Sequence, residues 1–159
     1  QLGITRTRQR SGWVIILANE TLLGPRSLLS LSDRALGSQG TLALAGQQMK
    51  FSREDVRDSG DVAFLKMPTT LKGAIRAWPR DQIRQPQKPE PCVLLRSASD
   101  APFPLTPNRL SPRSNGWQVD STISLDEDWS GAAVLSNTDG MLIGIVLVDE
   151  GRVRIAFIP

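Results

Sequence analysis

The sequence contains no histidine, no tyrosine and a single cysteine, Cys92. Zinc and copper sites in proteins are built mainly from imidazole and thiolate ligands, so this composition excludes a site of the ordinary kinds. One cysteine also excludes an internal disulfide bond, and its place beside an apolar run favours a buried, inert thiol. Glycine-rich phosphate loops and dinucleotide fingerprints are missing as well. We therefore expect neither a metal ion nor another cofactor.

Long hydrophobic runs are also absent. No apolar stretch approaches the roughly 20 residues that a membrane-spanning helix needs. The chain begins at Gln1 rather than at a methionine, and we expect it to be a fragment of a larger protein that has lost a signal, an anchor or a neighbouring domain. Membrane association would depend on such flanking segments.

Aromatic residues make up only 5% of the chain, although its net charge is +3. Proteins that bind nucleic acids usually concentrate basic residues on one face and add aromatic side chains that stack on bases. Here the basic residues are scattered along the sequence, from Arg6 to Arg113 and beyond. We therefore expect no nucleic-acid partner. An arginine-rich surface that contacts other proteins is an open alternative.

Hydrophobic residues make up 40% of the 159 residues, enough for one sizeable core or two small lobes that share an interface. Short apolar or β-branched runs alternate with turn residues, which predicts an all-β barrel or sandwich. The expected strands lie at 13–17, 22–23, 41–44, 47–51, 62–67, 92–96, 117–123, 132–135, 141–148 and 153–158. The segment 26–33 is the best candidate for a short helix.

Turn residues suggest how these strands connect. The pairs Asp139-Gly140 and Glu150-Gly151 accept the positive φ of tight turns, so they predict hairpins. The segment QPQKPEP at 85–91 cannot form a central strand, because proline has no N–H to donate. It predicts a linker at 86–91 between an N-terminal lobe at 1–85 and a C-terminal lobe at 92–159. The proline- and serine-rich segment 96–116 is expected to form a loop.

Four segments resemble landmarks of the trypsin-like serine proteases, and of their bacterial HtrA-type members in particular. They are SGWVI at 11–15, DSGDVAFLKM at 58–67, DWSGAA at 128–133 and RIAFIP at 154–159. The resemblance places Ser27, Asp61 and Ser130 at the positions of the catalytic histidine, aspartate and serine. It implies two six-stranded antiparallel β-barrels with short helical turns. It also implies an extracytoplasmic, periplasmic location and further domains, and it leaves homo-oligomer formation open.

The sequence departs from the family at the residues that carry out the reaction. Serine is a weak nucleophile without an adjacent base, and this chain has no imidazole to serve as one. Asp128 replaces the glycine of the oxyanion loop, where its charge would oppose a developing oxyanion. We therefore predict that the chain is not an enzyme but a pseudoprotease. The alternative is a hydrolase in which Ser130 is activated by Asp61, a lysine or a partner chain.

The predicted role is a protein-interaction, scaffolding or regulatory module that binds a protein or peptide without cutting it. The candidate binding residues are Asp128, Trp129, Ser130 and Gly131, in the cleft that the resemblance implies, and an extended peptide could add a strand to a sheet edge there. The acidic run 126–128 could meet a basic peptide or a hard cation. Because its spacing lacks the pattern of a calcium loop, we expect no metal site.

Overall fold

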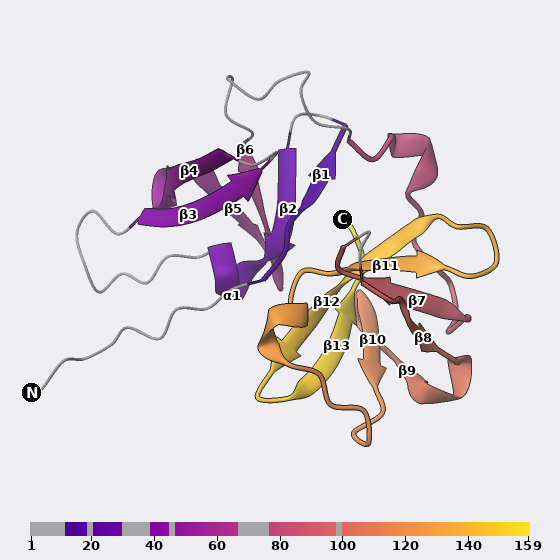
Figure 1. The fold of residues 1–159 in the computed structure, drawn as a ribbon. Coiled ribbons are helices and arrows are strands. Elements are labelled where there is room, and N and C mark those ends of the chain that lie inside the picture. Colours follow the sequence, from indigo (N-terminus) through magenta and orange to yellow (C-terminus); the bar gives the residue numbers. More distant parts are fainter. Residues whose placement is uncertain (1–11, 19–20, 30–38, 45–46, 67–76, 98–99) are drawn as a thin grey trace, which may run out of the picture.

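The computed structural model describes residues 12–18, 21–29, 39–44, 47–66, 77–97 and 100–159. These residues form two lobes, the first drawn in indigo and magenta and the second in orange and yellow (Figure 1). The elements are β1 (Ile15–Leu17), β2 (Thr21–Pro25), α1 (Arg26–Leu29), β3 (Gln39–Leu44), β4 (Gln47–Ser52), η1 (Arg53–Asp55), β5 (Val56–Ser59), β6 (Val62–Lys66), η3 (Arg80–Gln82), β7 (Cys92–Leu95), β8 (Phe103–Leu105), η4 (Pro107–Arg109), β9 (Leu110–Arg113), β10 (Gly116–Val119), η5 (Glu127–Trp129), β11 (Ala133–Ser136), β12 (Leu142–Asp149) and β13 (Arg152–Ala156).

The first lobe contains an antiparallel four-stranded sheet in the order β1-β2-β6-β5 and the separate hairpin β3-β4. Leu22, Ala63 and Leu65 of the central strands are almost fully buried, and they pack with Leu42 and Phe51 of the hairpin. The central strands therefore read as nearly continuous apolar runs, whereas the edge strand β5 is more polar.

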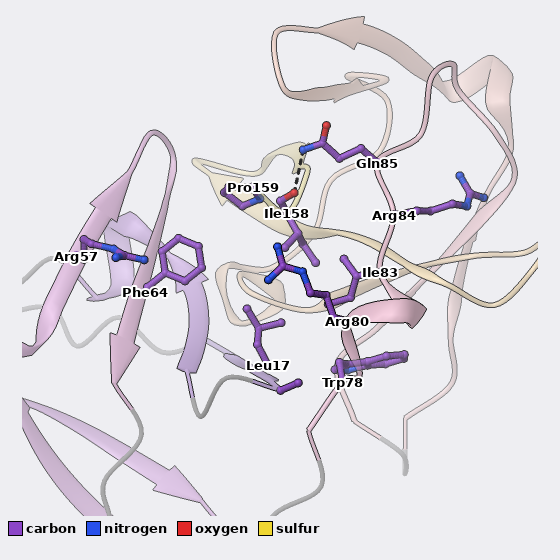
Figure 2. Close-up of a pocket in the computed structure, with 11 residues that line it drawn as sticks. Leu17, Arg57, Phe64, Trp78, Arg80, Ile83, Arg84, Gln85, Ile158 and Pro159 are labelled. Atoms are coloured by element: carbon purple, nitrogen blue, oxygen red, sulfur yellow. Dashed lines mark hydrogen bonds between the residues drawn. The ribbon is translucent and has the colours of Figure 1, made fainter.

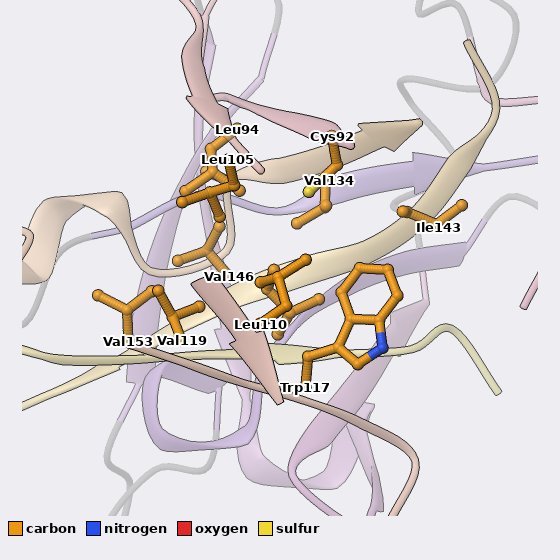
Figure 3. Close-up of a cluster of buried hydrophobic side chains, with 12 residues drawn as sticks. Cys92, Leu94, Leu105, Leu110, Trp117, Val119, Val134, Ile143, Val146 and Val153 are labelled. Atoms are coloured by element: carbon orange, nitrogen blue, oxygen red, sulfur yellow. The ribbon is translucent and has the colours of Figure 1, made fainter. Parts of the chain in front are cut away.

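The second lobe is one seven-stranded sheet in the order β8-β7-β11-β12-β13-β10-β9. Its core cluster is centred on Trp117, Val134, Ile143 and Val146, which lie among neighbouring strands (Figure 3). Cys92 belongs to this cluster, as expected, and burial raises the pKa of its thiol to about 12.

Strand β12 joins the two lobes. Successive residues of a strand point in opposite directions, and a register shift in the pairing of β12 with β11 at Ile143 changes this order at the start of the strand. Ile143 and Val146 enter the core of the second lobe, whereas Leu142 and Ile145 pack in a different cluster. This second cluster also contains residues of the first lobe, such as Leu23. The long apolar run 141–148 is therefore explained by burial on both faces.

The all-β class is confirmed, with differences in detail. The first lobe has six strands, but they form two sheets, and the second has seven, so two closed six-stranded barrels are not what the described residues form. The segment 96–116 was predicted to be a loop, and this is wrong because it contains β8 and β9. The predicted helix is present as α1, and its remaining residues 30–33 lie outside the described part of the chain.

Both hairpin predictions are confirmed. Glu150 and Gly151 have positive φ values of 51° and 80° between β12 and β13, and Gly140 has a φ of 74° between β11 and β12. The division at 1–85, 86–91 and 92–159 stays a prediction. None of the described helices is long and apolar enough to cross a membrane.

Candidate functional site

The elements that carry the three triad-like positions meet at one end of the junction between the lobes. Ser27 lies in α1, directly after β2, and Asp61 lies in the turn before β6. The backbone N–H of Arg26 donates to the carbonyl oxygen of Asp61 at 3.0 Å, which holds α1 beside that turn. A side chain at Gly12 would overlap both Leu28 of α1 and the Ser130 carbonyl oxygen. The order of landmarks read from the sequence thus corresponds to spatial proximity of α1, β6 and the Ser130 loop.

The Ser130 loop is fastened to both lobes. The loop follows the short helix η5. The carbonyl oxygen of Ser130 accepts a 2.7 Å hydrogen bond from the N–H of Trp13 in the first lobe. Gly131 donates at 2.7 Å to the carbonyl oxygen of Val146 in β12. Gly131 has a φ of 89°, and its α-carbon lies so close to the Trp13 carbonyl oxygen that a side chain would overlap it. Glycine is required here by both conformation and space.

The polar groups of Ser130 are bonded within the protein. The residue is only 4% exposed. Its hydroxyl donates to the Val148 carbonyl oxygen at 3.4 Å and accepts from the Val148 N–H at 3.3 Å. Its own N–H donates to the Glu127 carbonyl oxygen at 2.9 Å, whereas an oxyanion hole offers such N–H groups to the substrate. Nucleophilic attack from Ser130 would therefore require the loop to rearrange.

Asp61 bridges the lobes through its side chain. Its carboxylate accepts a 3.0 Å hydrogen bond from Arg154 in β13, and the two form an ion pair. Because the Asp61 side chain is well exposed, this pair is expected to contribute little to stability. Arg154 was not among the predicted site residues, since nothing in its local sequence indicates a partner 93 positions away.

Trp129 stands at the centre of a polar and aromatic arrangement. The Arg96 guanidinium carbon lies 4.5 Å from the centre of its ring, in a cation–π contact, and Phe103 meets it edge-on at 6.2 Å. Arg96 also pairs with Asp100 at 2.7 Å and with Asp128 at 3.0 Å. The pKa of Arg96 is raised, mainly by its hydrogen bond to Asp100. Electrostatic attraction to nearby carboxylates also raises it.

We call Arg96, Asp100, Asp128 and Trp129, together with the exposed Trp13 whose backbone binds Ser130, the Trp129 surface. Of the predicted binding residues, Asp128 is exposed, Trp129 is half-buried, and Ser130 and Gly131 are buried beneath them. Sequence reasoning missed Arg96 and Phe103, because both lie in the segment that was predicted to be a loop. In the described ranges, no three His, Cys, Asp or Glu side chains are grouped so that they could hold a metal ion, and the expectation for the acidic run 126–128 stays a prediction.

No protein-family model matches this chain, and no curated protein matches it in sequence. Solved structures of similar fold include three viral proteases. The catalytically inactive tobacco etch virus protease complexed with substrate is 15% identical, with a TM-score of 0.60 over 92% of this chain and 70% of that chain. The human astrovirus serine protease is 13% identical (TM-score 0.57; 93% and 83%), and the tobacco vein mottling virus protease is 16% identical (TM-score 0.57; 92% and 69%).

These neighbours correct one of the predictions made from the sequence. The prediction that the chain is not an enzyme is wrong, because the solved structures that share its fold are viral proteases. It rested on the missing imidazole, although other sites activate serine or threonine with a lysine or a terminal amine. The HtrA-type resemblance stays a prediction, since the neighbours found are viral. The trypsin/chymotrypsin-like fold is the common ground of sequence, structure and comparison.

Proposed function

We propose that this chain is a polypeptide-binding domain and that the Trp129 surface holds the partner. The observation that carries the proposal is the stack of Arg96 on Trp129, fixed by Phe103 on one side and by two carboxylates on the other. Tryptophan and arginine dominate the energetics of protein interfaces. Holding them in one geometry before the partner arrives reduces the ordering cost of binding.

Exposed apolar area beside this stack supports the same role. Trp13 is 38% exposed and is the only large hydrophobic side chain, of those described, that is exposed to this degree. Its backbone is hydrogen-bonded to Ser130, so it flanks the loop that carries Trp129. Asp126, Glu127 and Asp128 are exposed on the same loop. An extended segment with apolar anchors and a few basic residues fits this combination best.

The arginine-rich surface is a weaker alternative for the same role. The arginines at positions 26, 84, 96, 109 and 154 each pair with a carboxylate, so much of their charge is compensated within the domain. Binding through these arginines would weaken steeply as salt is added, whereas binding anchored by Trp13 and Trp129 would depend on salt only moderately. The extracytoplasmic location is a part of the proposal that rests on the HtrA-type resemblance, which leaves homo-oligomer formation open.

Peptides selected from a random phage-displayed library on the purified domain should combine apolar and basic residues. Their affinity, measured by fluorescence anisotropy of the labelled peptide, should fall about 30-fold in Trp129→Ala, which is about 2 kcal/mol. Trp13→Ala should cause a loss in the same direction, and its exposed position makes it the safer variant for folding. The matched control is Trp78→Ala, which removes a half-buried tryptophan at the opposite end of the junction. Loss of binding in Trp78→Ala with none in the other two variants would contradict the proposal.

Hydrolysis by Ser130 is a second candidate, because the structures that share this fold are proteases. It requires the Ser130 hydroxyl to leave Val148 and the Ser130 N–H to leave Glu127. It predicts that a fluorophosphonate probe forms an adduct detectable by intact mass, and that Ser130→Ala removes this adduct. An unmodified wild-type protein, under conditions in which an active serine protease reacts fully, would refute hydrolysis by this serine.

A further inference from the structure

A cavity of about 420 Å³ lies between the lobes, at the other end of their junction from Ser130 (Figure 2). Strand β1 leads from one site to the other, since Trp13 binds the Ser130 loop and Leu17 lines the cavity. Four residues of extended chain separate the two positions, which is about 13 Å. The volume is within the range of small-molecule sites, about 300 to 1,000 Å³. Neither the triad-like positions nor the Trp129 surface contributes to its lining.

Hydrogen bonds hold the walls of this cavity. The N–H of Trp78 donates to the Ile16 carbonyl oxygen at 2.8 Å, which fixes the segment that begins at Trp78 against β1. Arg84 donates through its backbone to the Leu142 carbonyl oxygen at 3.1 Å, and Gln85 donates through its side chain to the Ile158 carbonyl oxygen at 2.9 Å. The apolar side chains between these points come from both lobes and the segment 78–85; they are Leu17, Phe64, Trp78, Ile83 and Ile158. The cavity is therefore preformed, and its lining combines these apolar side chains with polar and charged ones.

Positive charge surrounds these apolar walls. Arg57, Arg80 and Arg84 belong to the lining, and no aspartate or glutamate side chain of the described residues does. Arg84 points away from the cavity in Figure 2, toward the carboxylates of Glu90 and Asp139 that bind it. Arg57 lies over the Phe64 ring at 5.1 Å. Arg80 extends beside Ile158 in the same view and has no ion-pair or hydrogen-bond partner for its side chain among the described residues.

We propose that this cavity binds an amphipathic carboxylate, a medium-chain fatty acid in its ionised form. The aliphatic tail lies against Leu17, Trp78 and Ile158, and the carboxylate accepts hydrogen bonds from the Arg80 guanidinium. Guanidinium and carboxylate match in a bidentate geometry, and an arginine without an internal partner has no pair to break when the ligand arrives. Arg57 adds a second positive charge at the Phe64 wall. The proposal is independent of the Trp129 surface.

Titration calorimetry with decanoate, below its micelle concentration, tests this inference on the intact chain. Decanoate should bind, and decanol, which has the same tail without the charge, should bind at least tenfold more weakly. Arg80→Ala should lower the affinity for decanoate about tenfold and leave that for decanol unchanged, while Arg80→Lys should restore part of the loss. Arg113→Ala, an exposed arginine of β9, is the matched control and should have no effect.

Three results would overturn the inference. They are absence of decanoate binding, equal affinity for decanoate and decanol, and an Arg80→Ala variant that binds decanoate as wild type does. Trp78→Ala serves as a second variant. It removes part of the apolar wall of the cavity, so it should lower the affinity for decanoate and decanol alike. Since Trp129→Ala leaves this cavity intact, decanoate binding in that variant separates the failure of one proposal from the failure of the other.

Discussion

Gly131→Ala should lower the free energy of unfolding by about 3 kcal/mol or more. Two costs combine at this position. A residue with a side chain is strained at a φ of 89° by roughly 1–2 kcal/mol. The new methyl group would also overlap the Trp13 carbonyl oxygen, which is backbone and cannot simply rotate away, and such overpacking costs typically 1–3 kcal/mol. The lobes would have to separate locally, with loss of the hydrogen bond from Trp13 to Ser130.

Gly140→Ala is the matched control for this prediction. Gly140 also has a positive φ, 74°, but an added methyl group would meet no atom within 4 Å. Its replacement should therefore cost only the conformational strain, about 1 kcal/mol. Urea unfolding of the two variants and the wild type provides the comparison. If Gly131→Ala is as mild as Gly140→Ala, the close approach of Trp13 to the Ser130 loop does not hold the lobes together.

Arg84→Ala should destabilise the protein by about 2–3 kcal/mol, because it disrupts a network that ties the linker to the second lobe. Arg84 binds both carboxylate oxygens of Glu90, at 2.9 and 2.5 Å, and its Nε donates to Asp139 at 2.8 Å. Ser136, which is buried in β11, donates to the same Glu90 carboxylate. Without Arg84, the Glu90 side chain, which is only 16% exposed, would keep its charge with no cation beside it.

Arg109→Ala is the control, since its ion pair with Asp120 is exposed (46% and 32% for the two side chains) and should contribute less than about 1 kcal/mol. The dependence of stability on pH provides a second measurement. The hydrogen bond from Arg84 lowers the pKa of Glu90 below its ordinary value of 4.5. The stabilisation is therefore complete above that value and is lost as the pH falls through the lower pKa of the folded state. The difference between wild type and Arg84→Ala should shrink over that range, and a constant difference would contradict the assignment.

The strands that sequence patterns failed to predict share a physical cause. β5, β8 and β9 are all edge strands of their sheets. β8 contains Pro104 and β9 contains Pro112, and proline is tolerated at an edge because the missing N–H would face outward. When only the local sequence is considered, proline predicts that a segment is not a strand. The buried strand β12 has no such ambiguity, since both of its faces demand apolar residues.

The candidate site also has features that the local sequence predicts and features that it does not. The loop at Ser130 and the turn at Asp61 carry local signals, so their positions in the chain could be predicted. The stack of Arg96 on Trp129 and the ion pair between Asp61 and Arg154 join segments that are far apart in sequence. Such pairs depend on how the lobes fold against each other, and no spacing rule in one sequence reveals them. The same limit applies to the cavity at Trp78, whose walls come from four separate stretches, 17–18, 57–64, 78–85 and 158–159.

The most direct test of the polypeptide-binding role is amide chemical-shift mapping of the labelled domain, titrated with a library-selected peptide. The account predicts that the largest changes lie at Trp13, Arg96, Phe103 and residues 126–131, with residues 78–85 unaffected. Changes confined to 78–85, or spread evenly without saturation, would contradict the assignment of the Trp129 surface as the place where a partner binds.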